Sequence, residues 1–223
     1  MEKKLHRKGD NMKKIIFLMV SIGSILAILG SCAKDDDAAS TTSCATDTTA
    51  SGSITVGSET LSGVYISECN TTQFQAAAGS SLFPSDVKSG KTAVVVTGST
   101  TLTEEMLMYT DTSCSTPSLT YKNVRDNLTV GDASGSNYKV TYNADSIKIK
   151  PSTTVAETEI EAFATSAGQS WALTVDTETT HGDSGSSYMN LFLVTSTTIT
   201  TGDGDKTTQP TAVDSMVMTK SCE

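Results

Sequence analysis

The stretch His181-Gly182-Asp183-Ser184-Gly185 comes nearest to a catalytic set of residue types in this chain. A serine nucleophile needs a histidine base, itself oriented by a carboxylate, that reaches the hydroxyl from elsewhere in the fold. After residue 31 the chain has one histidine, His181, which stands three residues before Ser184 in the same stretch. The pattern therefore predicts a polar loop between strands, and we expect a protein that is not an enzyme.

Two further acidic patterns could bind a metal or transfer protons. Gly202-Asp203-Gly204-Asp205 resembles the start of a calcium loop, but the bidentate glutamate of an EF-hand is missing, and Ala212 stands nine positions after Asp203. Glu157, Glu159 and Glu161 would spread around the surface of a helix. No two cysteines have the Cys-x-x-Cys spacing of a zinc site. We expect a solvated turn, a solvated helix face, and no metal or other cofactor.

The thiol of Cys32 suggests a different chemistry. Lys13 and Lys14 precede an apolar run from Ile15 to Leu29, which is too short to span a bilayer. With small residues before a cleavage position, this pattern is typical of a secretory signal peptide over residues 1–31. Leu29-Gly30-Ser31-Cys32 resembles the lipobox of bacterial lipoproteins. The resemblance implies cleavage before Cys32 and acylation of its thiol and new amine; the alternative is an ordinary signal peptide with an incidental cysteine.

Lipidation of Cys32 would make the lipid bilayer a partner of the protein. Two or more acyl chains anchor a protein stably, whereas one holds it only marginally. Lys34 stands at the second position after Cys32, where the familiar inner-membrane signal has an aspartate. We therefore expect a location in the cell envelope, at the outer membrane, on a side that the sequence leaves open.

Four more cysteines follow, namely Cys44, Cys69, Cys114 and Cys222. An exported chain meets an oxidising environment, where an even number of cysteines indicates disulfides. Three pairings are possible, and the sequence alone does not choose among them. We favour Cys69–Cys114 together with Cys44–Cys222. In the chain-entropy model, closing a loop of the Cys69–Cys114 size is worth about 4 kcal/mol.

Composition narrows the partners and the fold class. Residues 1–31 carry six Lys or Arg and two Asp or Glu, so their removal changes the net charge from -9 to -13. Such a polyanion repels nucleic-acid phosphates, and we expect no nucleic-acid binding. Ser and Thr make up 64 of the 192 residues that remain. Threonine favours strands and serine favours turns, which points to an all-β domain.

The order of patterns along the chain predicts three parts. Residues 32–60 have few bulky side chains and should form a disordered tether after the lipidated cysteine, with a first strand at Ser53–Val56 as the alternative. Residues 61–223 should form a domain of about eight short antiparallel strands. We expect it to close into an up-and-down β-barrel, with a two-sheet sandwich as the alternative. Residues 155–166 are the one helix that we expect.

Individual patterns give finer predictions within the domain. Alternation predicts a hairpin with strands at 138–142 and 147–149 around a turn at 143–145, and further strands at 171–175 and 215–219. Met106, Met108, Met216 and Met218 should fill gaps in the core, since methionine adapts to irregular spaces. The alternative is that they line a ligand cavity.

Two segments resemble a recurrent pattern in small, uncharacterised bacterial lipoproteins. These are Gly63-Val64-Tyr65-Ile66-Ser67-Glu68-Cys69 and Tyr109-Thr110-Asp111-Thr112-Ser113-Cys114. The family form has Trp at the position of Tyr65 and Arg at the position of Gln209. The resemblance covers about residues 62–220 and implies a lipocalin-like barrel without a settled activity. We therefore expect a membrane-anchored, non-catalytic barrel that binds a small ligand; the alternative is a surface-displayed adhesin-type lipoprotein that contacts partner proteins.

Overall fold

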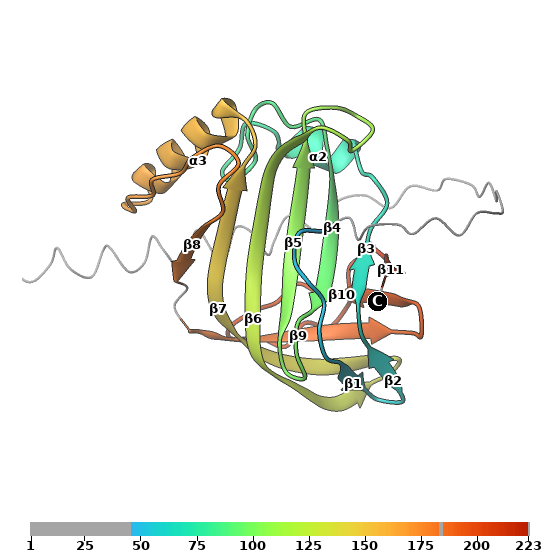
Figure 1. Ribbon diagram of the computed structural model, residues 1–223. Helices are drawn as coiled ribbons and strands as arrows, with labels where there is room; N and C mark the ends of the chain where they lie inside the picture. The colour runs from blue at the N-terminus through green and yellow to red at the C-terminus, as the bar shows by residue number, and fades with distance from the viewer. Residues whose placement is uncertain (1–45, 183–184, 223) are drawn as a thin grey trace, which may run out of the picture.

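The structure, a computed structural model, describes residues 46–182 and 185–222 (Figure 1). Eight antiparallel strands form a closed barrel in the order β6-β5-β4-β3-β11-β10-β9-β7, and pairing of β6 with β7 completes the ring. Closure confirms the predicted barrel and excludes the sandwich. The barrel strands are β3 (Val64–Ile66), β4 (Ser89–Val96), β5 (Leu102–Tyr109), β6 (Pro117–Ser134), β7 (Asn137–Pro151), β9 (Ser187–Val194), β10 (Thr198–Thr201) and β11 (Met218–Cys222).

The long hairpin of β6 and β7 corrects one prediction. Residues 143–145 were expected to turn the chain, but β7 runs through them, and the turn is instead the pair Gly135-Ser136. Ala144 is fully buried, and β6 pairs with β7 on both sides of it. Burial and pairing therefore outweigh the turn preference of Asn143 and Asp145. The other edge of β7 pairs first with β9 and then with the short β8 (Thr179–Gly182).

A second hairpin corrects the predicted start of the folded domain. β1 (Ile54–Val56) pairs with β2 (Glu59–Leu61), so residues 54–60 belong to the fold and not to a tether. Ile54, Val56 and Leu61 are buried in one core cluster. Gly57 has a positive φ, and a Cβ atom there would overlap the Tyr138 hydroxyl, so glycine is required. The hairpin lies at the end of the barrel where β6 and β7 curve (Figure 1).

Two helices lie at the other end of the barrel (Figure 1). The longer one, α3 (Thr154–Ser166), confirms the expected helix, and the Thr153 side chain caps it by accepting from the Ala156 N–H at 3.1 Å. The shorter one, α2 (Thr72–Ala77), was not predicted. The predicted strand at 171–175 is wrong, because this segment makes only an isolated bridge between Thr174 and Thr177. The last strand starts at Met218, later than the predicted 215.

A disulfide between Cys69 and Cys114 confirms the favoured pairing. It ties the chain after β3 to the turn between β5 and β6. Asp111 organises that turn, because its carboxylate accepts from the backbone N–H groups of Ser113, Ser115 and Thr116. Cys44 lies outside the described residues, so the pairing of Cys44 with Cys222, the last residue of β11, stays a prediction.

The interior contains two separate hydrophobic clusters. One lies toward the β1–β2 end and includes Tyr65, Leu102 and Phe192, all fully buried. The other joins the two helices to the sheet, with Phe74 from α2 and Ile160 from α3. A cavity lined by both apolar and charged side chains opens between these clusters, and it is the candidate site.

Candidate functional site

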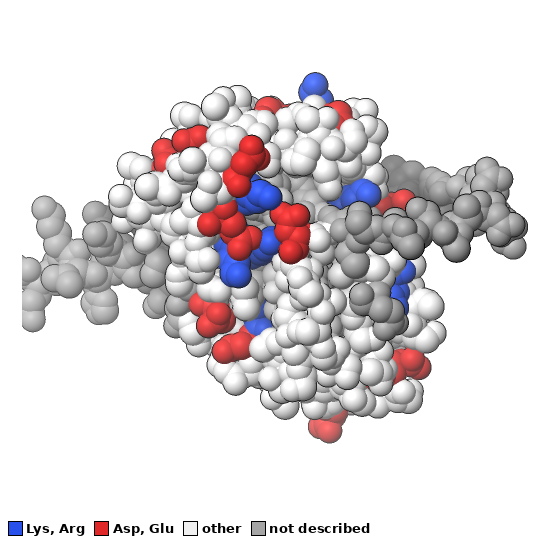
Figure 2. Space-filling model, viewed as in Figure 1, with Lys and Arg blue, Asp and Glu red and all other residues white. Residues whose placement is uncertain are grey.

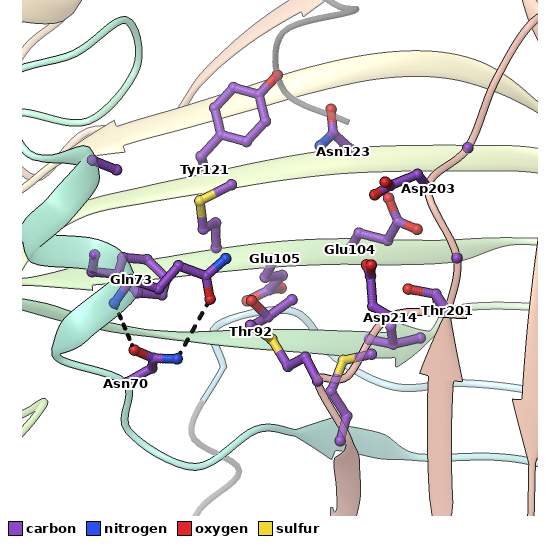
Figure 3. A pocket seen from close by; sticks show the side chains of 18 of the residues that line it. Asn70, Gln73, Thr92, Glu104, Glu105, Tyr121, Asn123, Thr201, Asp203 and Asp214 are labelled. Atoms are coloured by element: carbon purple, nitrogen blue, oxygen red, sulfur yellow. Dashed lines mark hydrogen bonds between the residues drawn. The ribbon is translucent and has the colours of Figure 1, made fainter. Parts of the chain in front are cut away.

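A cavity of about 640 Å³ lies inside the barrel. Helix α2 and the residues after it form one end of the lining, and the segments 201–204 and 214–218 form another. The side walls are residues of β4, β5, β6, β7 and β9. Figure 3 shows carboxylates grouped on one side of this space and the amides of Asn70 and Gln73 on the opposite side.

Helix α2 covers the cavity because the sheet allows a close approach. The Phe74 ring packs against Gly90 of β4, where any Cβ atom would overlap it. Asn70 precedes the helix and its side-chain oxygen accepts from the Gln73 N–H at 2.9 Å. Phe74 itself is buried and stacks edge-on against Phe83, with ring centroids 5.9 Å apart. The cover is therefore held by packing as well as by hydrogen bonds.

Methionines form the adaptable, apolar part of the lining. Met106, Met216 and Met218 line the cavity together with Val94. Met108 is buried in the cluster beneath the helices, as expected for a core methionine. Met218 is buried in the other core cluster and also lines the cavity, so for this residue the two roles coincide. Flexible thioether side chains suit a surface that must fit an apolar ligand.

A buried ion pair crosses the interior between β5 and β6. Arg125 donates from Nε and Nη2 to Glu104 Oε2 at 3.2 and 3.1 Å. Its guanidinium lies 5.0 Å from the Tyr142 ring centroid and 5.6 Å from that of Tyr188. Burial lowers the pKa of Arg125, but the Glu104 carboxylate more than offsets this, so the guanidinium stays charged. Burial, with a further contribution from Glu104, raises the pKa of Tyr142 to about 12.

Two aspartates come to the cavity from the loop after β10. The Gly202 N–H donates to the Leu191 carbonyl at 2.8 Å, and the Asp214 N–H donates to the Thr201 carbonyl at 2.8 Å. These bonds hold both ends of the loop against the barrel, and Asp203 and Asp214 line the cavity beside Glu104 (Figure 3). Burial, together with the nearby Asp203 charge, raises the pKa of Asp214 to about 6.

The outer face of the same strands has a second set of charges, over β5, β6 and β7 (Figure 2). Lys122 forms ion pairs with Glu178 at 2.7 Å, and Lys150 pairs with Asp47 at 2.9 Å. Glu105 borders the cavity through its strand, but its carboxylate lies near Lys122 and Thr48 on this outer face. Burial raises the pKa of Glu105.

Of the stretch at 181–185, the structure describes His181, Gly182 and Gly185. His181 belongs to β8, and its ring stacks on Trp171 with centroids 4.5 Å apart. Burial lowers the pKa of His181. Asp183 and Ser184 lie outside the described residues, as do Cys32 and residues 1–31, where a signal peptide is predicted. Within the part of the chain that the structure describes, no helix is long and apolar enough to cross a membrane.

The acidic patterns have structural roles that the sequence did not indicate. Asp205 accepts from the Thr207 and Thr208 N–H groups, whereas Asp203 lines the cavity, so the expected solvated turn is only half right. On α3, Glu159 accepts from the Ser85 N–H at 2.6 Å, and Glu161 accepts from the Leu173 N–H at 2.8 Å. These two glutamates attach loops to the helix. No cluster suited to a metal ion occurs among the described residues.

Sequence reasoning missed the polar residues of the cavity, namely Glu104, Arg125, Asp203 and Asp214. One available signal was the alternation of Leu102, Glu104 and Met106 in β5, which puts a carboxylate on the same face as two apolar side chains. A charge on an apolar face indicates a buried pair or a site.

The fold and the cavity together define a class, an eight-stranded antiparallel barrel with an interior space, and this class is compatible with a lipocalin-like domain. Comparison of the chain with protein-family models and with curated proteins finds no match.

Proposed function

We propose that this protein is a lipid-anchored envelope protein that binds a small amphipathic ligand in its barrel cavity and catalyses no reaction. The cavity of about 640 Å³ is the observation that carries the proposal. Small-molecule sites have volumes of about 300–1,000 Å³ and combine an apolar lining with a few convergent polar groups. Phe74, Val94 and the methionines supply the apolar lining, while Glu104, Arg125 and Asp214 supply the polar groups.

Filling the cavity tests this proposal. Thr92 lines the cavity from β4, and the neighbouring Lys91 lies at the next position of the strand, on the opposite face. We expect Thr92→Trp to weaken binding of the neutral fluorescent probe N-phenyl-1-naphthylamine at least about tenfold, because the indole occupies the space. Lys91→Trp is the matched control and should leave binding unchanged. Fluorescence titration of the purified protein, corrected with a detergent blank, measures both.

Two outcomes would contradict the cavity proposal. The first is the absence of saturable binding by the unaltered protein. The second is equal binding by the unaltered protein and by Thr92→Trp, provided that both have the same circular dichroism spectrum.

Anchoring is a separate part of the proposal and rests on the lipobox resemblance at Cys32. We expect Cys32→Ala to move the protein from the membrane fraction to the soluble fraction of bacterial cells, because the acylated thiol is lost. Unchanged partition in the membrane fraction would argue against lipidation. Protease added to intact cells then tests whether the barrel is displayed on the surface.

A further inference from the structure

We propose that the ligand of the cavity is an organic cation, whose protonated amine lies among Asp214, Asp203 and Glu104 and whose apolar part lies against the methionines and Phe74. This inference rests on the proposed function, since it names the class of ligand for the same cavity. It is argued from the charges on the lining, from the position of Asp214 and from the separation of polar and apolar surfaces.

The charges that face the cavity do not balance. Among the described residues that line the cavity, the carboxylates of Glu104, Asp203 and Asp214 face the space, Arg125 is the one basic residue, and Asp214 is the carboxylate without a partner. Glu104 already holds Arg125 through two hydrogen bonds to one oxygen. An anionic ligand would have to displace Glu104 from Arg125 and would then meet three negative charges. A cation meets the opposite sign, and charge complementarity of this kind selects partners.

Asp214 has the position of a ligand-binding carboxylate. Its side chain is half-buried, borders the cavity and makes no hydrogen bond or ion pair within the described residues. Its backbone is fixed by the bond from the Asp214 N–H to the Thr201 carbonyl. A half-buried carboxylate without a partner is costly unless another group supplies a positive charge or a proton. The raised pKa of Asp214 agrees with this geometry.

The apolar surface lies where the rest of such a ligand would fit. Figure 3 places Asp203, Asp214 and Glu104 on one side, with methionine sulfurs between them and α2. Met106 and Met216 line the cavity, and Phe74 lines it from α2. A molecule with an amine at one end and an apolar body at the other therefore matches both surfaces.

Three probes with the same fluorophore and the same chain length test the inference. They are dansylcadaverine, which ends in an ammonium group, N-pentyl dansylamide, which is neutral, and dansyl-6-aminohexanoate, which ends in a carboxylate. We expect the ammonium probe to bind at least about tenfold more tightly than the neutral probe, and the carboxylate probe to bind most weakly. Fluorescence titration at pH 7.5 measures all three with the purified protein.

A matched pair of variants tests whether Asp214 is the source of the preference for the ammonium probe. Asp214→Asn should lower the preference for the ammonium probe, measured as the ratio of its affinity to that of the neutral probe, about tenfold. Asp132→Asn, which removes the same charge from an exposed position at the end of β6, should preserve the preference. Equal affinities for the three probes, or an unchanged preference in Asp214→Asn, would overturn the inference while the cavity proposal stands. Absence of saturable binding by all three would overturn the cavity proposal itself.

Discussion

Both faces of the wall formed by β5, β6 and β7 contain a carboxylate beside a cation, but the groups around each pair differ. Glu104 and Glu105 are neighbours in β5 and lie on opposite faces. On the inner face Glu104 pairs with Arg125, and on the outer face Glu105 lies near Lys122. Both faces therefore place a carboxylate and a cation at the middle of the sheet, where neither group is well exposed to water.

The two faces differ in what completes each cluster. On the outer face each of Lys122, Lys148 and Lys150 has an ion-pair partner, and the chain itself brings these acids, Asp47 from before β1 and Glu178 from before β8. On the inner face carboxylates outnumber cations, and the remaining neighbour is a cavity. A charge cluster that is balanced by its own chain fixes the fold. A cluster with surplus charge beside a space is where a ligand can supply the missing cation.

The largest expected effect is on the inner face. Arg125→Met should lower the free energy of unfolding by about 3–5 kcal/mol, because it leaves the Glu104 carboxylate without a cation in the interior. Chemical denaturation at pH 7.5 measures the loss. Adding Glu104→Gln should recover part of it, since the uncompensated charge is then removed. A loss no larger than that of an exposed ion pair would show that water reaches this pair.

Removing the equivalent cation on the outer face should lower the free energy of unfolding by less. Lys122→Met leaves Glu105 and Glu178 without their nearest lysine, but Glu178 is partly exposed, so we expect about 1–3 kcal/mol. Adding Glu105→Gln should recover part of this, because burial already disfavours the Glu105 carboxylate. If Lys122→Met costs as much as Arg125→Met in the same denaturation experiment, the two faces are equivalent and the comparison fails.

Lowering the pH should weaken binding of an organic cation at the inner face. The charged groups around Asp214 are Asp203 from the same loop, Glu104 from β5 and its partner Arg125 from β6. Because the pKa of Asp214 is about 6, most of this carboxylate is protonated at pH 5. Affinity for dansylcadaverine should therefore fall about tenfold, or 1.4 kcal/mol, between pH 7.5 and pH 5. In Asp214→Asn the affinity should change much less with pH, and an identical pH profile would contradict the assignment.

The same titration should affect stability in a defined direction. The folded pKa of Asp214 lies above the ordinary value of 3.8, so the folded state binds this proton more tightly than the unfolded state. The contribution of Asp214 to stability therefore becomes more favourable as the pH falls from 7 to 5. Asp214→Asn should remove that part of the pH dependence in thermal unfolding curves.

The smallest expected effect is at the edge of the outer cluster. Asp47→Asn breaks the ion pair with Lys150. Because the Asp47 side chain is 62% exposed, the free energy of unfolding should fall by only about 0.2–1 kcal/mol. The pKa of Asp47 is lowered chiefly by its hydrogen bond with Lys150, so this contribution is present above the ordinary value of 3.8 and is lost as the pH falls below it. Repeating the unfolding experiment in 1 M salt should remove most of the difference. A salt-independent loss would show that Asp47 acts by packing.

The elements with regular local patterns could be predicted from the sequence. The alternation of residues 138–142 and the helix pattern of residues 155–166 are properties of consecutive residues, and the structure contains both, in β7 and as α3. The missed elements depend on distant partners. Residues 143–145 read as a turn and were drawn into β7 by pairing with β6, and Ile54 and Val56 became ordered by packing into a core assembled from later strands.

The site was harder to predict for the same reason. Arg125 reaches Glu104 only because antiparallel register places Leu102 opposite Arg125 and Glu104 opposite Asn123. Asp203 and Asp214 are eleven residues apart, in a stretch whose composition indicates an exposed loop. Backbone bonds to Leu191 and Thr201 turn these aspartates into lining of the cavity. No local pattern in the sequence carries that information.

If Cys32 is acylated as proposed, the contacts of residues 47–51 with the barrel limit the distance between the domain and the membrane. Asp47 pairs with Lys150, and the Ser51 N–H donates to the Val96 carbonyl at 2.8 Å. With Cys32 in the bilayer, a chain unattached up to residue 61 could extend about 100 Å, whereas attachment at residue 46 limits it to about 50 Å. If both the anchoring and the ligand-binding proposals hold, the barrel collects its ligand from the layer next to the membrane surface.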